Sequence, residues 1–115
     1  MEDISKLREI IVKFREERDW KQFHNPKDLA ISMMLEAGEV LEHFEWMNKE
    51  EQWKKVESHK EEISEELADV FSYLLLLCND LDIDLSDAFI KKLEKSSKKY
   101  PVDKAKGNHT KYTEL

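Results

Sequence analysis

Two pairs of acidic residues are spaced so that they could act together. Glu36 and Glu39 lie three residues apart in "LEAGEVLE", and Glu66 and Asp69 have the same spacing in "EELADV". If both stretches are helical, this spacing of about one turn places the two carboxylates of each pair on one helix face. Apolar residues flank both pairs at helical intervals, so the acids border faces that should be buried. Two packed helices would then each offer an acidic pair.

Carboxylates gathered in this way favour the binding of a divalent cation. Unpaired carboxylates at a partly buried site raise one another's pKa values, and burying their charge is costly unless something compensates it. No Lys or Arg lies in the middle of either stretch. An all-oxygen site suits Mg²⁺, with Mn²⁺ as a substitute, rather than Zn²⁺. The alternative is that these acids simply face solvent, and their spacing alone leaves both readings open.

The sequence as a whole predicts an all-α fold, a four-helix bundle that forms one domain over residues 1–115. Only two Gly and two Pro interrupt the chain, and no run alternates β-branched residues in the manner of a strand. Apolar residues that recur every three or four positions, together with the N-cap residues Asn25, Asn48, Ser58 and Asp84, predict the helices. The expected helices cover residues 3–18, 26–46, 49–56, 59–81 and 85–99, and an irregular tail follows from about residue 102.

The helix expected over residues 59–81 is apolar over an unusually wide part of its surface. Its apolar residues include Ile63, Leu67, Val70, Phe71, Leu74, Leu77 and Leu81. One four-helix bundle would not cover so wide a face, so we expect a homodimer or homotetramer. Gly38 lowers helix propensity by about 1 kcal/mol, and its small size would let another backbone or a ligand approach closely.

Charge and composition exclude several classes of partner. The formal net charge of −7 would repel the phosphates of a nucleic acid polymer. No apolar run approaches the roughly 20 residues that cross a bilayer, and the amino end begins with a charged amphipathic pattern rather than a signal peptide. The single cysteine, Cys78, lies in an apolar run and is expected to be buried rather than catalytic. A cytoplasmic protein with no membrane partner is the simplest expectation.

Five stretches of the sequence occur together in a fixed order. They are "ERDWKQFHNPKDLA" (17–30), "LEAGEVLEHFEW" (35–46), "EELADVFSYLLLL" (65–77), "KKYPVDKAKG" (98–107) and "KYTEL" (111–115). In combination they resemble the MazG-type nucleoside triphosphate pyrophosphohydrolases. Within that superfamily they are most similar to the single-domain dCTP pyrophosphatase branch, and the resemblance extends from about Ile4 to Leu115.

The resemblance implies a four-helix bundle that assembles as a dimer or a dimer of dimers and uses Mg²⁺. It would hydrolyse a nucleoside triphosphate to the monophosphate and pyrophosphate. By the family's motifs, the catalytic metal ligands would be Glu36, Glu39, Glu66 and Asp69. The positions that would shape or contact the nucleotide are Trp20, His24, Trp46, Tyr73, Lys92, Ser96, Lys99 and Tyr100. Ser96 stands where the family usually carries Asn, and its shorter side chain would weaken a direct contact with the substrate or metal.

We therefore expect a Mg²⁺-dependent enzyme of nucleotide-pool housecleaning that acts on dCTP or on modified pyrimidine deoxynucleotides. Related dUTP and phosphoribosyl-ATP pyrophosphohydrolases of the same superfamily are the enzymatic alternatives. A helical assembly module that binds nucleotide or metal without turnover is the non-enzymatic alternative. The presence of all four acidic residues favours the enzyme.

Overall fold

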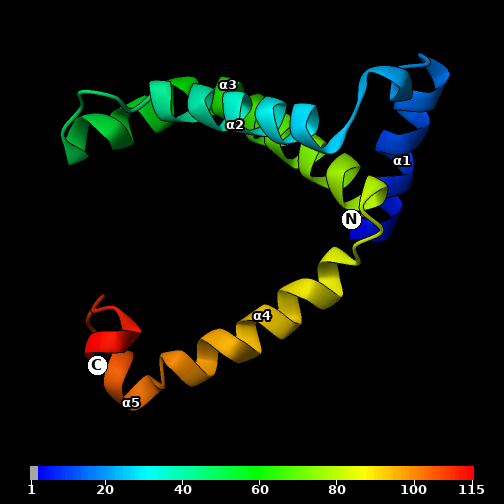
Figure 1. Ribbon diagram of the computed structural model, residues 1–115. Coiled ribbons are helices and arrows are strands. Elements are labelled where there is room, and N and C mark those ends of the chain that lie inside the picture. Colours follow the sequence, from blue (N-terminus) through cyan, green and yellow to red (C-terminus); the bar gives the residue numbers. More distant parts are fainter. Residues whose placement is uncertain (1–2) are drawn as a thin grey trace. The chain divides into compact units, whose positions relative to one another are not determined.

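The computed structural model describes residues 3–115, and within that range every regular element is a helix (Figure 1). This confirms the predicted all-α class. The elements in chain order are α1 (Ile4–Glu17), η1 (Lys21–Phe23), α2 (Pro26–Glu42), α3 (Lys49–Asp80), α4 (Leu85–Lys99), α5 (Val102–Ala105) and η2 (Tyr112–Glu114).

Capping side chains fix where the helices begin. The Asn25 side chain accepts a hydrogen bond of 2.9 Å from a backbone N–H in the first turn of α2. Asn48 and Glu51 form a capping box at the start of α3. Asp3 and Asp84 cap α1 and α4 in the same way as Asn25 caps α2. The predicted helix starts at residues 26, 49 and 85 are therefore confirmed.

The structure differs from the expected helices at two places. The helix α2 ends at Glu42, four residues early, and the turn that follows places Trp46 at a positive φ of 64°. The two helices expected over 49–56 and 59–81 are joined in α3, which is kinked at His59 (φ −128°, ψ 26°). The Ser58 hydroxyl does not cap a second helix, because it bonds to the Lys55 carbonyl instead (3.2 Å).

The chain divides into two compact units, Met1–Asp82 and Ile83–Leu115, called here the first and the second unit. In the first unit, α3 packs along α2 and also contacts α1 (Figure 1). The buried side chains at these contacts are few: Leu29, Ile63, Leu75, Leu76 and Cys78 among the apolar ones, together with Arg15. Burial also raises the pKa of the Cys78 thiol, as befits a core residue rather than a nucleophile.

The second unit consists of α4 and a C-terminal segment that folds back onto its end. The rings of Tyr100 and Tyr112 meet edge to face, with centroids 5.9 Å apart, and the Lys99 ammonium lies 4.6 Å from the Tyr112 ring centroid. The segment expected to be irregular thus contains two short helical turns, α5 and η2. Whether the two units form one domain and a four-helix bundle remains a prediction.

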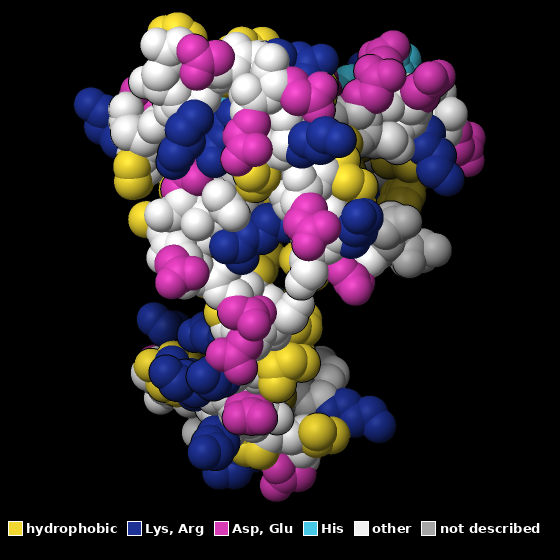
Figure 2. All heavy atoms as spheres, turned by 90° about the vertical axis from the view of Figure 1, so that its right-hand side faces the viewer, with side chains coloured by type: hydrophobic (Ala, Val, Ile, Leu, Met, Phe, Trp, Pro, Cys, Tyr) yellow, Lys and Arg dark blue, Asp and Glu magenta, His cyan; other side chains and the backbone are white. Residues whose placement is uncertain are grey.

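Charged side chains of both signs cover the molecule. On the face in Figure 2, Lys and Arg are interspersed with Asp and Glu, and hydrophobic side chains are exposed between them. Within residues 3–115, no helix combines the length and the apolar character that a membrane crossing requires.

Candidate active site

The four predicted carboxylates come together where α2 packs on α3. Burial raises the pKa of Glu36, and a hydrogen bond shared with the Glu39 side chain on α2 raises it further. The negative charges of Glu39 and of Asp69 and Glu66 on α3 act in the same direction. One carboxylate oxygen of Glu36, Oε2, is fully buried and has no hydrogen-bond partner among the described residues. The site therefore concentrates negative charge around a carboxylate that nothing in the described protein neutralises.

A histidine that the sequence analysis missed contacts this cluster. His43 Nε2 lies 2.5 Å from Glu66 Oε2, and the two side chains are only 11% and 23% exposed. The ring N–H donates to the carboxylate, which fixes the orientation of Glu66. His43 follows Glu39 by four residues, so its position on the same face of α2 was readable from the helical spacing.

The side chains of the cluster are of the kind that bind a hard divalent cation, but they are not yet arranged around a common point. All four donors are carboxylates, the kind of oxygen ligand that Mg²⁺ takes, and an ion would neutralise the unpartnered Glu36 oxygen. In residues 3–115, however, no three or more His, Cys, Asp or Glu side chains are already arranged to hold a metal ion. Binding would therefore require these side chains to move, whereas only one carboxylate oxygen of Glu66, Oε2, is engaged by His43.

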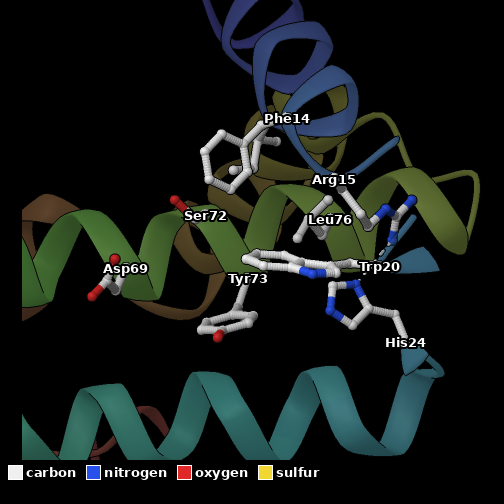
Figure 3. Close-up of a pocket in the computed structure, with 9 residues that line it drawn as sticks. Phe14, Arg15, Trp20, His24, Asp69, Ser72, Tyr73 and Leu76 are labelled. Carbon is white, nitrogen blue, oxygen red and sulfur yellow. Dashed lines mark hydrogen bonds between the residues drawn. The ribbon is translucent and has the colours of Figure 1, made fainter. Parts of the chain in front are cut away.

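An aromatic cavity of about 370 Å³ opens beside the carboxylates (Figure 3). It is lined by Ile11, Phe14, Arg15, Trp20, His24, Asp69, Ser72, Tyr73 and Leu76. Its volume is in the range of small-ligand sites. Three residues that the resemblance assigned to the nucleotide, Trp20, His24 and Tyr73, are therefore brought together. Asp69 belongs both to this cavity and to the carboxylate cluster, so the two are continuous.

The connection between α1 and α2 holds Trp20 against the cavity. Asp19 adopts a positive φ of 54°, which ends α1, and the Trp20 backbone N–H bonds back to the Arg15 carbonyl (3.1 Å). The Trp20 ring meets Phe14 edge to face, with centroids 5.8 Å apart. The Arg18 guanidinium lies over the Phe14 ring at 3.7 Å. These contacts hold the indole in place.

Arg15, which lines the cavity, forms a buried ion pair with Asp80. Arg15 is 2% exposed and donates two hydrogen bonds of 2.8 Å to the two carboxylate oxygens of Asp80. The hydrogen bonds from Arg15, supported by Lys21 and Asn79, hold the pKa of Asp80 far below its usual range despite burial. The same guanidinium lies 3.4 Å from His24 Nδ1. Arg15 and Asp80 are 65 residues apart, so no local pattern could have revealed the pair.

The other residues assigned from the resemblance lie away from this cavity or in the second unit. Trp46 is 99% exposed and does not line the cavity. Lys92, Ser96, Lys99 and Tyr100 belong to α4 and its end. Their contribution to the site stays a prediction.

Comparison with known proteins decides the family. The model of the MazG-like family matches residues 31–115. The chain belongs to the MazG-like family. Over its whole length it is 38% identical to dCTP pyrophosphatase 1 of Mus musculus and 37% identical to that of Homo sapiens, and it spans 67% of each of those proteins. The crystal structure of a pyrophosphatase from Archaeoglobus fulgidus, 39% identical, matches with a TM-score of 0.83 over 88% of this chain and 94% of that one.

These findings confirm the resemblance stated from the sequence. They also confirm the expected class of enzyme for this chain, a hydrolase of nucleoside triphosphates with a housecleaning role. The geometry adds what the comparisons do not describe, namely the His43–Glu66 contact and the Arg15–Asp80 pair.

Loss of the Asp80 carboxylate should destabilise the fold in a pH-dependent way. Replacing Asp80 by Asn leaves the Arg15 charge buried without its partner, so the free energy of unfolding at pH 7 should fall by about 3 kcal/mol. Because the pKa of Asp80 is lowered in the folded state, the pair stabilises the protein above the ordinary carboxyl pKa of about 4 and loses its effect as the pH falls further. The difference from wild type should shrink in acid, as measured by urea unfolding.

Glu9→Gln on α1 is the matched control, since the ion pair of Glu9 with Lys6 is exposed. It should change the free energy of unfolding by less than about 1 kcal/mol at any pH. Equal changes in the free energy of unfolding for the two substitutions would show that the buried pair stabilises the fold no more than an exposed pair does.

Proposed function

We propose that this chain hydrolyses dCTP or a modified pyrimidine deoxynucleoside triphosphate to the monophosphate and pyrophosphate. The observation that carries the proposal is the double position of Asp69, at the edge of the aromatic cavity and within the carboxylate cluster. A nucleotide whose base enters the cavity would have its phosphates beside the carboxylates. The dCTP pyrophosphatases among its relatives support the choice of base.

A nucleotide cannot approach four carboxylates unless a cation intervenes, and we infer that the cation is Mg²⁺, with Mn²⁺ as a substitute. Glu36, Glu39, Glu66 and Asp69 would hold it. When bound, such an ion neutralises phosphate oxygens and lowers the pKa of a water molecule. Glu39 is the exposed member of the pair on α2, so it is our candidate for orienting the attacking water.

The cavity would bind the base. The rings of Trp20 and Tyr73 offer aromatic faces, and a base stacked on such a ring gains about 1–3 kcal/mol in nucleic-acid binders. The ring of His24 contributes a hydrogen-bonding nitrogen at the same cavity. We further propose that Lys92, Ser96, Lys99 and Tyr100 on α4 contact the phosphates, as the family resemblance implies. Their lysines would supply positive charge for that role.

An exposed apolar stripe on α2 supports assembly into a homodimer or homotetramer. Ile31, Met34, Leu35 and Leu41 are between 48% and 67% exposed and follow helical spacing along one face of α2. Gly38 lies on the same face, and no atom of residues 3–115 outside its own helix comes within 4 Å of where its Cβ would be. A second copy of the chain could therefore approach α2 closely at this point. We propose that this stripe, called here the α2 stripe, is a contact between copies.

Turnover should be selective and should need a divalent cation. Incubation with a panel of nucleoside triphosphates should release pyrophosphate fastest from dCTP or its base-modified analogues, and EDTA should abolish the release until excess Mg²⁺ is added. Faster turnover of dUTP or phosphoribosyl-ATP would favour the alternative enzymes. Absence of turnover for the whole panel would contradict the enzymatic function and leave a binding module.

The carboxylate cluster should be needed for activity but not for folding. Glu39→Gln or Asp69→Asn should lower kcat at least a hundredfold, since each removes a negative charge from the site that would hold the cation. The helical circular dichroism should stay unchanged. Glu65→Gln is the control, because Glu65 precedes Glu66 on α3 but neither lines the cavity nor is among the charges that raise the pKa of Glu36. Wild-type rates in both site variants would show that the ligand assignment is wrong.

The α2 stripe should determine the size of the assembly. Light scattering after size-exclusion chromatography should give a dimer or tetramer for the wild type and a monomer for Leu35→Glu, which places a charge in the stripe. Val102→Glu, at an apolar position in the second unit that is also well exposed, should leave the mass unchanged. A wild-type monomer, or an unchanged mass for Leu35→Glu, would contradict the proposed contact.

A further inference from the structure

In the wall of the aromatic cavity, His24 lies beside the guanidinium of Arg15, which stays positively charged. Arg15 is immobilised by its two hydrogen bonds to Asp80, and its Nη1 lies 3.4 Å from His24 Nδ1. A guanidinium only donates hydrogen bonds and stays protonated in proteins. The nitrogen of His24 that faces it must therefore be the acceptor. In a neutral imidazole, the hydrogen then resides on Nε2.

The charges around His24 favour the same neutral form. Burial lowers its pKa, and the positive charges of Arg15 on α1 and Lys21 on η1 lower it further, against the opposing effect of Asp80 on α3. Asp69 and Tyr73, also on α3, are the other titratable groups that line the cavity. None of the hydrogen bonds among the described residues uses His24 Nε2, which is not among the buried unpartnered atoms either. Nε2 is therefore accessible and available for a hydrogen bond to a ligand.

We propose that Arg15, held by Asp80, locks His24 in its Nε2–H tautomer and so makes it a fixed hydrogen-bond donor for an acceptor atom of the bound base. Arg15 is then a positioning residue, and His24 is the residue that touches the substrate. The use of this donor rests on the proposed function, whereas the tautomer itself does not. A carbonyl oxygen or an unprotonated ring nitrogen of a pyrimidine is the chemistry that such a donor recognises.

A fixed tautomer matters for selectivity. An imidazole free to exchange tautomers could donate or accept, and would then tolerate either kind of group on a base. A ring that only donates rejects a base that places a donor at this point, because both groups would be left unpaired inside the cavity. Arg15 and Asp80 thereby contribute to the choice of base without touching it.

Nitrogen NMR of the histidine rings tests the proposal on the nucleotide-free protein. The chain has four histidines, so the spectrum of His24→Gln identifies the signals of His24. We expect its Nε2 to be protonated and its Nδ1 unprotonated at neutral pH, and its pKa to lie below the ordinary value. A hydrogen on Nδ1 in the wild type would overturn the proposal.

Removal of the pair should release the ring. Arg15→Met alone removes the two strongest hydrogen bonds of the buried Asp80 and leaves it only Lys21 and Asn79, which would destabilise the fold. The informative variant is therefore Arg15→Met with Asp80→Leu, which leaves no buried charge of this pair behind. In this double variant, His24 should populate both tautomers and its pKa should rise. The single variant Arg15→Lys keeps a positively charged donor beside His24. It should therefore show more of the Nε2–H tautomer than the double variant does, though less than the wild type. An unchanged tautomer and pKa in the double variant would show that Arg15 does not control the ring.

Steady-state kinetics test whether His24 donates a hydrogen bond to the substrate. His24→Phe should raise KM for the preferred nucleotide roughly threefold to tenfold with a smaller effect on kcat, the size expected for one hydrogen bond. His109→Phe, at an exposed position in the second unit, is the control. An unchanged KM in His24→Phe would contradict the donor role. If the panel of nucleotides shows no turnover, the NMR result still decides whether the tautomer is fixed.

Discussion

The repulsion among four carboxylates is the constraint on which the rest of the structure depends. Glu36 is half-buried with one oxygen unpartnered, and the charges of Glu39, Glu66 and Asp69 all act to raise its pKa. A fold gains no stability from such an arrangement, because unpaired buried charge is costly. The capped helices α2 and α3 nevertheless hold the acids together. This cost is what motivates the proposal that the cluster binds a cationic ligand.

The position of the aromatic cavity beside this cluster narrows the kind of ligand that both could bind. An aromatic cavity alone would suit many small apolar molecules, and four acids alone would suit any hard cation. Asp69 joins them, so a ligand that fills both needs a flat ring at one end and negatively charged oxygens that share a cation at the other. A nucleoside triphosphate has both features. The ion pair of Arg15 and Asp80 then orders the wall that would meet the ring.

The local features of the fold were readable from the sequence, and the long-range ones were not. The caps at Asn25 and Asn48 involve residues three positions apart, so helix starts could be predicted to the residue. The pairing of Arg15 with Asp80 depends on how α1 packs against α3, which no short pattern encodes. Trp46 shows the limit of a motif match, since its ring is fully exposed and away from the cavity. Spacing placed each acidic pair on one helix face, and the family resemblance assigned all four acids to one site. Neither predicted the unpartnered oxygen of Glu36.

Thermal unfolding of wild type and Glu36→Gln, with and without Mg²⁺, tests the central claim most directly. Without the ion, Glu36→Gln should unfold at a higher temperature than the wild type, because it removes a buried charge that has no partner. Mg²⁺ should raise the unfolding temperature of the wild type, and it should raise that of the variant much less. A variant that is less stable without Mg²⁺, or that gains as much from the ion as the wild type, would contradict the account.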